Sequence, residues 1–171
     1  MKLQRFVFVG ALIVLFIITI FASLYFGKPK INFSELIENE NTNDISLKIH
    51  YVDPDSLMEP LSFDELVSMH NSKKIVVSGS DLEEHIDLFK EMDNYSLTLV
   101  IWKTARQAFL RVYYVLESKK NGKLFEVAMW GNNYSVFVNG VEVKGKPIFY
   151  DVIIPFLSKD SIYKFHFNNY E

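Results

Sequence analysis

Two aromatic side chains enclose a short polar segment late in the chain, a pattern that is suited to contact with a ligand. Trp130 and Tyr134 stand on either side of Asn132 and Asn133. Aromatic rings beside side-chain amides suit contact with a peptide or a glycan. In the strand register derived below, Arg111 lies opposite Trp130 on the outer face, in reach of a cation–π contact. We name these five residues as candidate ligand-binding residues. The competing interpretation is that the rings pack on neighbouring strands and the asparagines serve the turn.

The sequence predicts no metal site, no cofactor and no catalytic residue. No two of the histidines have the i, i+4 helical spacing of a zinc site; they are His50, His70, His85 and His166. Neither a GxSxG elbow, nor a P-loop, nor a GxGxxG motif is present. The twenty-one acidic residues offer many carboxylate pairs, and the sequence gives no distances by which to choose one.

An apolar run of 21 residues begins at Phe6 and ends at Phe26, and it contains no charge. At 1.5 Å per residue, a helix of this length crosses the ~30 Å hydrocarbon core of a bilayer. Its only polar side chains are the hydroxyls of Thr19, Ser23 and Tyr25, which can bond to the helix backbone or lie near the interface. The run therefore predicts a lipid bilayer as the first partner of this chain.

A retained signal anchor explains this run better than a cleaved signal peptide. The apolar core of a cleaved signal is usually about 7–15 residues long, and large side chains follow Ala22, the one small residue suited to precede a cut. Lys2 and Arg5 before the run, against Lys28 and Lys30 after it, indicate a cytoplasmic N-terminus. We expect a single-pass cell-membrane protein with residues 1–5 inside, 6–27 as the anchor, 28–43 as a linker and an extracytoplasmic domain over 44–171.

Charge and cysteine content limit what the external part can do. Residues 31–171 hold fourteen bases and twenty-one acids, a net charge of −7, which argues against nucleic acid as a partner. The absence of cysteine excludes thiol nucleophiles and thiolate metal sites, so stability must come from packing. About 141 residues suffice for one domain with a real core.

The hydrophobic pattern of the external part predicts an α+β domain in which helices cover an antiparallel β-meander. Period-2 alternation or short β-branched runs predict strands at 45–51, 73–78, 97–102, 109–117, 124–130, 134–138 and 141–143. Short connections imply antiparallel neighbours. The Asn139-Gly140 pair predicts a type I′ turn that pairs Val138 with Val141.

Register between strands 109–117 and 124–130 follows from burying both hydrophobic sets on one face. A four-residue loop that pairs Ser118 with Lys123 satisfies this condition. A two-residue Asn121-Gly122 turn also satisfies it, but sets Glu117 against Glu126, which is unfavourable. We therefore expect the longer loop.

Capping signals predict where the helices begin. Ser62 with Glu65, and Ser80 with Glu83, have capping-box spacing, and the second box opens an amphipathic helix. Ser34 is suited to cap a short helix before an exposed linker. A last helix is expected between Pro147 and Pro155. For residues 161–170 we leave open an edge strand or a docked aromatic tail.

Tethering, together with the missing catalytic signatures, favours a binding or accessory module at the cell envelope. Its ligand would be a peptide, a glycan or another envelope protein. The alternative is an envelope hydrolase with a scattered carboxylate or histidine site, for which a deep pocket lined by two acids is expected.

Overall fold

The computed structural model describes residues 13–16, 18–19, 31–53, 61–94, 97, 110–129 and 135–165. The chain divides into two compact units, residues 1–30 and 31–171. Most of the predicted span lies outside the described residues; those of its residues that are described are helical. Among the described residues, the helices lack the length and apolar character needed to cross a bilayer, so the anchor stays a prediction from the sequence.

The described part of residues 31–171 forms an antiparallel sheet with helices packed on it, as the hydrophobic pattern predicts. The strands are β1 (Ile45–Tyr51), β2 (Lys73–Ser78), β3 (Val112–Ser118), β4 (Gly122–Met129), β5 (Ser135–Val138) and β6 (Val141–Lys144). Their order in the sheet is β2-β1-β3-β4-β5-β6, and each neighbouring pair is antiparallel. The predicted strand at 97–102 lies outside the described residues except for Leu97, which is buried.

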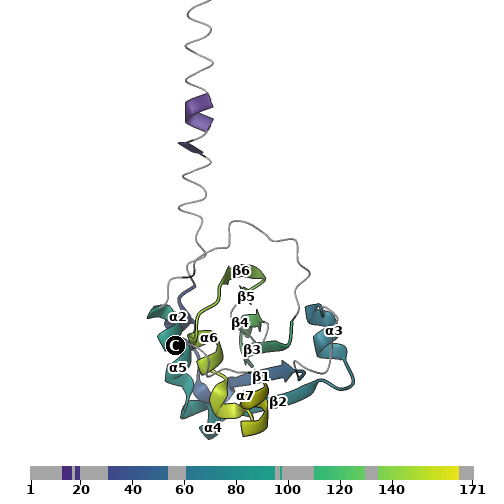
Figure 1. The fold of residues 1–171 in the computed structure, drawn as a ribbon. Helices are drawn as coiled ribbons and strands as arrows, with labels where there is room; N and C mark the ends of the chain where they lie inside the picture. Colours follow the sequence, from purple (N-terminus) through teal and green to yellow (C-terminus); the bar gives the residue numbers. More distant parts are fainter. Residues whose placement is uncertain are drawn as a thin grey trace, which may run out of the picture. The chain divides into compact units, whose positions relative to one another are not determined.

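One face of the sheet carries the main core. Ile49, Tyr114 and Val127 occupy successive strands in register and are fully buried. Figure 1 shows most of the helices gathered around this face of the sheet. The elements that contribute buried side chains to it are α2 (Phe33–Glu38), α4 (Ser80–Glu83), α5 (Ile86–Glu91), η3 (Met92–Asn94), α6 (Ile148–Asp151) and α7 (Lys159–Phe165). Burial of this apolar surface is the main stabilising contribution to the fold.

The second face is covered over part of its width by α3 (Phe63–Ser68). The capping box predicted for this helix is present: the Ser62 hydroxyl accepts from the Glu65 backbone N–H, and the Glu65 carboxylate accepts from the Ser62 N–H. Leu66 of α3 packs on Tyr113 and Val115 of β3 in a smaller apolar cluster. The sheet is therefore buried on both sides under α3 and less completely towards β5 and β6.

The β3–β4 register is as predicted along the strands and differs at the turn. Val112 pairs with Met129 and Leu116 with Phe125, which is the expected register. A bulge after Leu116 then shifts the ladder, so Ser118 pairs with Gly122 and not with Lys123. The loop therefore has three residues, and Gly122 has a φ of +71°, as expected where a bulge follows a three-residue loop.

The Asn139-Gly140 turn is confirmed. Val138 pairs with Val141 across it, and φ is positive at both central residues, +48° and +76°. The side chain of Asn139 also accepts a hydrogen bond from the backbone N–H of Glu126 at 2.9 Å.

Three helix predictions need correction. The Ser80–Glu83 capping box is wrong, because Gly79 occupies the N-cap position with no side-chain bond, and the helix breaks at His85 into α4 and α5. Asn32, not Ser34, caps α2. The predicted last helix is interrupted, since α6 ends at Asp151 and a 3₁₀ turn, η4 (Ile154–Phe156), follows it.

The short helix predicted near Ser34 belongs to the domain and not to a linker, and the start of the tail is helical. The predicted linker contains α2, whose Phe33 and Ile37 are buried in the main core. Residues 159–165 form α7, so an edge strand at the start of the tail is wrong. Phe165 of α7 is buried against Tyr51 with a ring separation of 6.1 Å, while residues 166–171 lie outside the described part of the chain.

Candidate functional site

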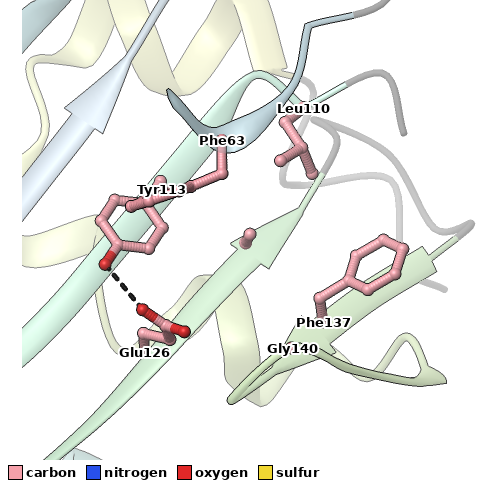
Figure 2. A pocket seen from close by; sticks show the side chains of 7 residues that line it. Phe63, Leu110, Tyr113, Glu126, Phe137 and Gly140 are labelled. Atoms are coloured by element: carbon pink, nitrogen blue, oxygen red, sulfur yellow. Dashed lines mark hydrogen bonds between the residues drawn. The ribbon is translucent and has the colours of Figure 1, made fainter. Parts of the chain in front are cut away.

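A pocket of about 260 Å³ opens on the second face of the sheet, beside α3. Its floor is Ala128 of β4, which pairs with Tyr113 on one side and with Phe137 on the other. Side chains at paired positions project from the same face of a sheet. The methyl group of Ala128 therefore leaves a gap between two aromatic side chains, and Figure 2 shows Tyr113 and Phe137 on either side of it.

Two further apolar side chains contribute to the walls. Phe63, the first residue of α3, meets Tyr113 edge to face with ring centroids 4.4 Å apart, and Leu110 adds an aliphatic wall. Ligand sites for drug-sized molecules are commonly about 300–1,000 Å³. A pocket slightly below this range is suited to one ring or one large side chain.

Among the described residues that line the pocket, Glu126 supplies the one carboxylate. Its Oε2 accepts hydrogen bonds from the Tyr113 hydroxyl and from Lys123 Nζ, both at 2.9 Å. Within the described part of the chain, Oε1 makes no hydrogen bond, and Figure 2 shows it turned away from the Tyr113 hydroxyl. One oxygen of a carboxylate that is bonded on the other side is thus open to a ligand.

The same contacts fix the protonation state of Tyr113. Burial, together with the hydrogen bond to Glu126, raises the pKa of Tyr113 well above its ordinary value of 10.0. The hydroxyl therefore stays protonated and acts as a donor to the carboxylate over the physiological pH range.

Of the predicted ligand-binding residues, Arg111 is the one that the structure describes. It precedes β3 on the second face of the sheet and is 1% exposed, which is much less than an outer-face cation–π site implies. Its Nη1 donates to the carbonyl oxygen of Leu110 at 2.9 Å, so it lies next to a pocket wall. Burial lowers the pKa of the Arg111 guanidinium.

The other four predicted residues lie outside the described residues. They are Trp130, Asn132, Asn133 and Tyr134. The cation–π contact between Arg111 and Trp130 is accordingly untested and stays a prediction.

The sequence contained a signal for the pocket that we did not use, because the predicted binding residues were chosen around a polar turn. The expected β3–β4 register already pairs Tyr113 with Ala128. A small side chain opposite a large aromatic one, on a face with a second covering element, indicates a gap. The positions of Phe137 and Phe63 in the pocket could not be predicted in this way. They depend on the β4–β5 register and on the placement of α3, and no short-range pattern provides either.

A Ser-x-x-Lys spacing, which the motif analysis missed, is present at Ser161 and Lys164. In serine acyl-transfer enzymes this spacing brings a lysine to a nucleophilic serine. Here Ser161 is 0% exposed, and its hydroxyl bonds to Tyr51 at 3.3 Å and to Ser158 at 2.9 Å. The buried hydroxyl belongs to the contact between α7 and β1.

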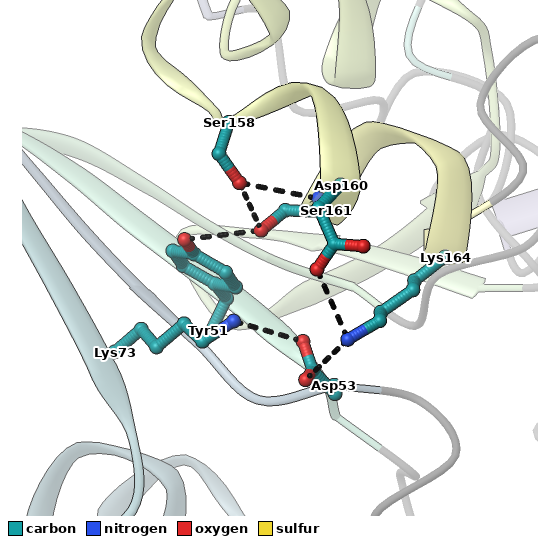
Figure 3. A network of polar contacts seen from close by, with 7 residues as sticks. All are labelled: Tyr51, Asp53, Lys73, Ser158, Asp160, Ser161 and Lys164. Carbon is teal, nitrogen blue, oxygen red and sulfur yellow. Dashed lines mark hydrogen bonds and ion pairs between the residues drawn. The ribbon is translucent and has the colours of Figure 1, made fainter.

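Lys164 forms ion pairs with two carboxylates. Its Nζ lies 3.1 Å from Asp160 and 3.1 Å from Asp53, and Asp53 also binds Lys73 at 3.2 Å. Figure 3 shows both lysines reaching Asp53 from different elements. The hydrogen bonds of Asp160 and Asp53 raise the pKa of Lys164, which keeps the amine charged and unsuited to act as a base. This network joins α7 to β1 and β2.

A metal centre is not visible in the described part of the chain, where no three His, Cys, Asp or Glu side chains lie together in a ligating group. Comparison with known proteins adds no assignment: no family model, curated protein or solved structure matches this chain.

Proposed function

We propose that this chain is a single-pass membrane protein of the cell envelope, and that its α+β domain binds a protein or peptide partner through the pocket over Ala128. The N-terminus would lie in the cytoplasm and the domain outside. The observation that carries the proposal is the pocket itself: three aromatic side chains around a small floor residue, with a carboxylate oxygen open at one end.

The membrane part of the proposal rests on the apolar run and on one local contact. Thr19 Oγ1 donates to the carbonyl oxygen of Phe16 at 2.9 Å and to that of Leu15 at 3.0 Å. A hydroxyl bonded to its own helix presents no unsatisfied donor to lipid. This supports a bilayer as the environment of the segment.

The chemistry of the pocket favours a particular kind of ligand group. The rings of Phe63, Tyr113 and Phe137 attract an apolar or aromatic group, and their faces also attract a cation. Glu126 Oε1 accepts a hydrogen bond or pairs with positive charge. The preferred group is an apolar side chain that ends in an N–H donor or a cation.

Small probes test this preference. We expect 2-phenylethylammonium to bind the full chain in detergent micelles about 3-fold more tightly than the isosteric 2-phenylethanol, because of the carboxylate and the rings. Binding is measured by NMR titration of ¹³C-labelled methyl groups, with those of Ala128 and Leu110, which both line the pocket, as reporters. Glu126→Gln should reduce the difference between the two probes to the part that the rings contribute.

The matched variants distinguish the pocket from the rest of the surface. Ala128→Leu fills the floor and should abolish binding of both probes, while Val76→Leu adds the same kind of apolar bulk on the same face outside the pocket and should change nothing. If Ala128→Leu binds both probes like the unmodified chain, the pocket is not the site and the proposal is wrong.

A further inference from the structure

The outer edge of β2 borders a groove in the described part of the chain. β2 ends the sheet order and has one strand neighbour, β1. An edge strand presents unpaired backbone N–H and C=O groups, and lysine is a common device for protecting such an edge. Lys73 and Lys74 protect the first half of β2. The second half reads Ile75-Val76-Val77-Ser78 and has no charge, and Val76 is 56% exposed.

A groove runs along this unprotected half. Its near side is formed by Ile75, Val76, Val77 and Ser78 of β2. Its far side is formed by Asp81 of α4, by the two residues that follow this helix, and by Pro155 and Phe156 of η4. Its volume is about 540 Å³. The groove therefore offers a strand edge on one side and a wall on the other, which is the arrangement that accepts an added strand.

The far wall of the groove carries acidic side chains. Asp81, Glu84 and His85 line the groove, and both carboxylates are exposed. Leu82 of α4 and Phe156 of η4 pack into the main core, so the wall lies on the core side of the sheet. Side chains of an added strand alternate between the two faces. Those on the core side would meet Asp81 and Glu84, and those on the other side would cover Val76.

We propose that the β2 edge binds an extended segment of a partner protein in which basic residues alternate with apolar ones. Backbone hydrogen bonds to β2 would hold the segment, the basic side chains would pair with Asp81 and Glu84, and the apolar side chains would cover Val76. This site is separate from the pocket over Ala128, and it does not depend on the function proposed for that pocket.

Three peptides test the proposal on the full chain in detergent micelles. The first is an acetylated, amidated hexapeptide of alternating lysine and valine; the second has glutamate for lysine; the third is the lysine peptide with N-methylated valines. Affinity is measured by fluorescence anisotropy, and amide hydrogen exchange is followed at residues 75–78. We expect the first peptide to bind at least about 3-fold more tightly than either of the others, and to slow exchange at alternate amides of β2.

Charge variants provide the matched control. Asp81→Lys with Glu84→Lys should reverse the preference, so that the glutamate peptide binds best. Glu83→Lys changes a charge on the same short helix outside the groove and should leave the order of the peptides unchanged.

Two results would overturn the proposal. Equal binding of the N-methylated peptide would mean that charge alone, without strand pairing, accounts for the affinity. Slow exchange at residues 75–78 in a concentration-dependent dimer that no peptide dissociates would assign the edge to a second copy of this chain.

Discussion

Asp93 fixes the first turn of α2 from a position 60 residues further along the chain. Its two carboxylate oxygens accept from the backbone N–H groups of Phe33 at 2.6 Å and Ser34 at 2.7 Å. The first N–H groups of a helix have no partner inside the helix, so a carboxylate there satisfies them and also interacts favourably with the helix dipole. Burial raises the pKa of Asp93, but the hydrogen bonds of Ser34 and Phe33 outweigh it, and the pKa lies below its ordinary value.

This contact predicts a pH-dependent stability. A lowered folded-state pKa stabilises the fold at pH values above the ordinary pKa of 3.8, and the contribution is lost as pH falls below that value. Asp93→Asn should lower the free energy of unfolding by about 1 kcal/mol near neutral pH. The measurement is urea unfolding at a series of pH values. The variant should show a weaker dependence on acid than the unmodified chain, and Asp81→Asn, at an exposed carboxylate, serves as the control.

The contacts of single side chains could be predicted from the sequence where the two partners lie a few residues apart. Ser62 and Glu65 lie three residues apart, and their reciprocal bonds could be predicted from spacing. The contact of Asp93 with α2 could not be predicted, because it depends on how α5 and η3 pack beside α2. The same limit applies to Arg111: its nearly complete burial depends on the placement of residues that are distant in the sequence.

The β3–β4 hairpin shows how one residue sets the geometry of an element. Gly122 has a φ of +71°, and a Cβ built on it meets nothing within 4 Å. The strain of a substitution would therefore come from the backbone conformation alone. The carboxylate of Glu40 accepts hydrogen bonds from Ser118 and Asn121 and so holds the turn from outside.

We expect Gly122→Ala to lower the free energy of unfolding by about 1–2 kcal/mol, because alanine disfavours this conformation. Lys120→Ala, in the same exposed turn, should change it by less than about 0.5 kcal/mol. Both values come from chemical denaturation. A cost for Gly122→Ala no greater than that of Lys120→Ala would mean that the turn readily adopts another form.

Elements with strong periodicity were predicted well, and those that depend on neighbours were not. β1 and β2 match the predicted ranges, and the Asn139-Gly140 turn is confirmed because its geometry is local. The break at His85 was missed because an amphipathic stripe continues through it, and tertiary packing decides where the helix changes direction. α7 was missed because Ile162, Lys164 and Tyr163 alternate as a strand would, while Ser158 stabilises its first turn by accepting from the Ser161 N–H at 3.2 Å.

For the whole molecule, the proposed topology can be tested with cysteine, which the chain does not contain. Lys2→Cys and Lys146→Cys would each introduce the only thiol. In intact cells a membrane-impermeant maleimide should label the second variant and not the first, and permeabilised cells should label both. Labelling of Lys2→Cys in intact cells would reverse the proposed orientation. Release of the chain by alkaline carbonate extraction would refute the anchor.

The attachment of α2 also determines how the domain responds to mechanical force. Any tension that reaches residue 31 along the backbone enters the domain at Phe33, whose ring is buried 5.0 Å from that of Phe125 in the central hairpin. The two bonds to Asp93 lie at the same entry point. Detaching α2 would therefore require breaking both bonds and withdrawing an aromatic ring from the core. In a single-molecule pulling experiment, Asp93→Ala should lower the force of the first rupture.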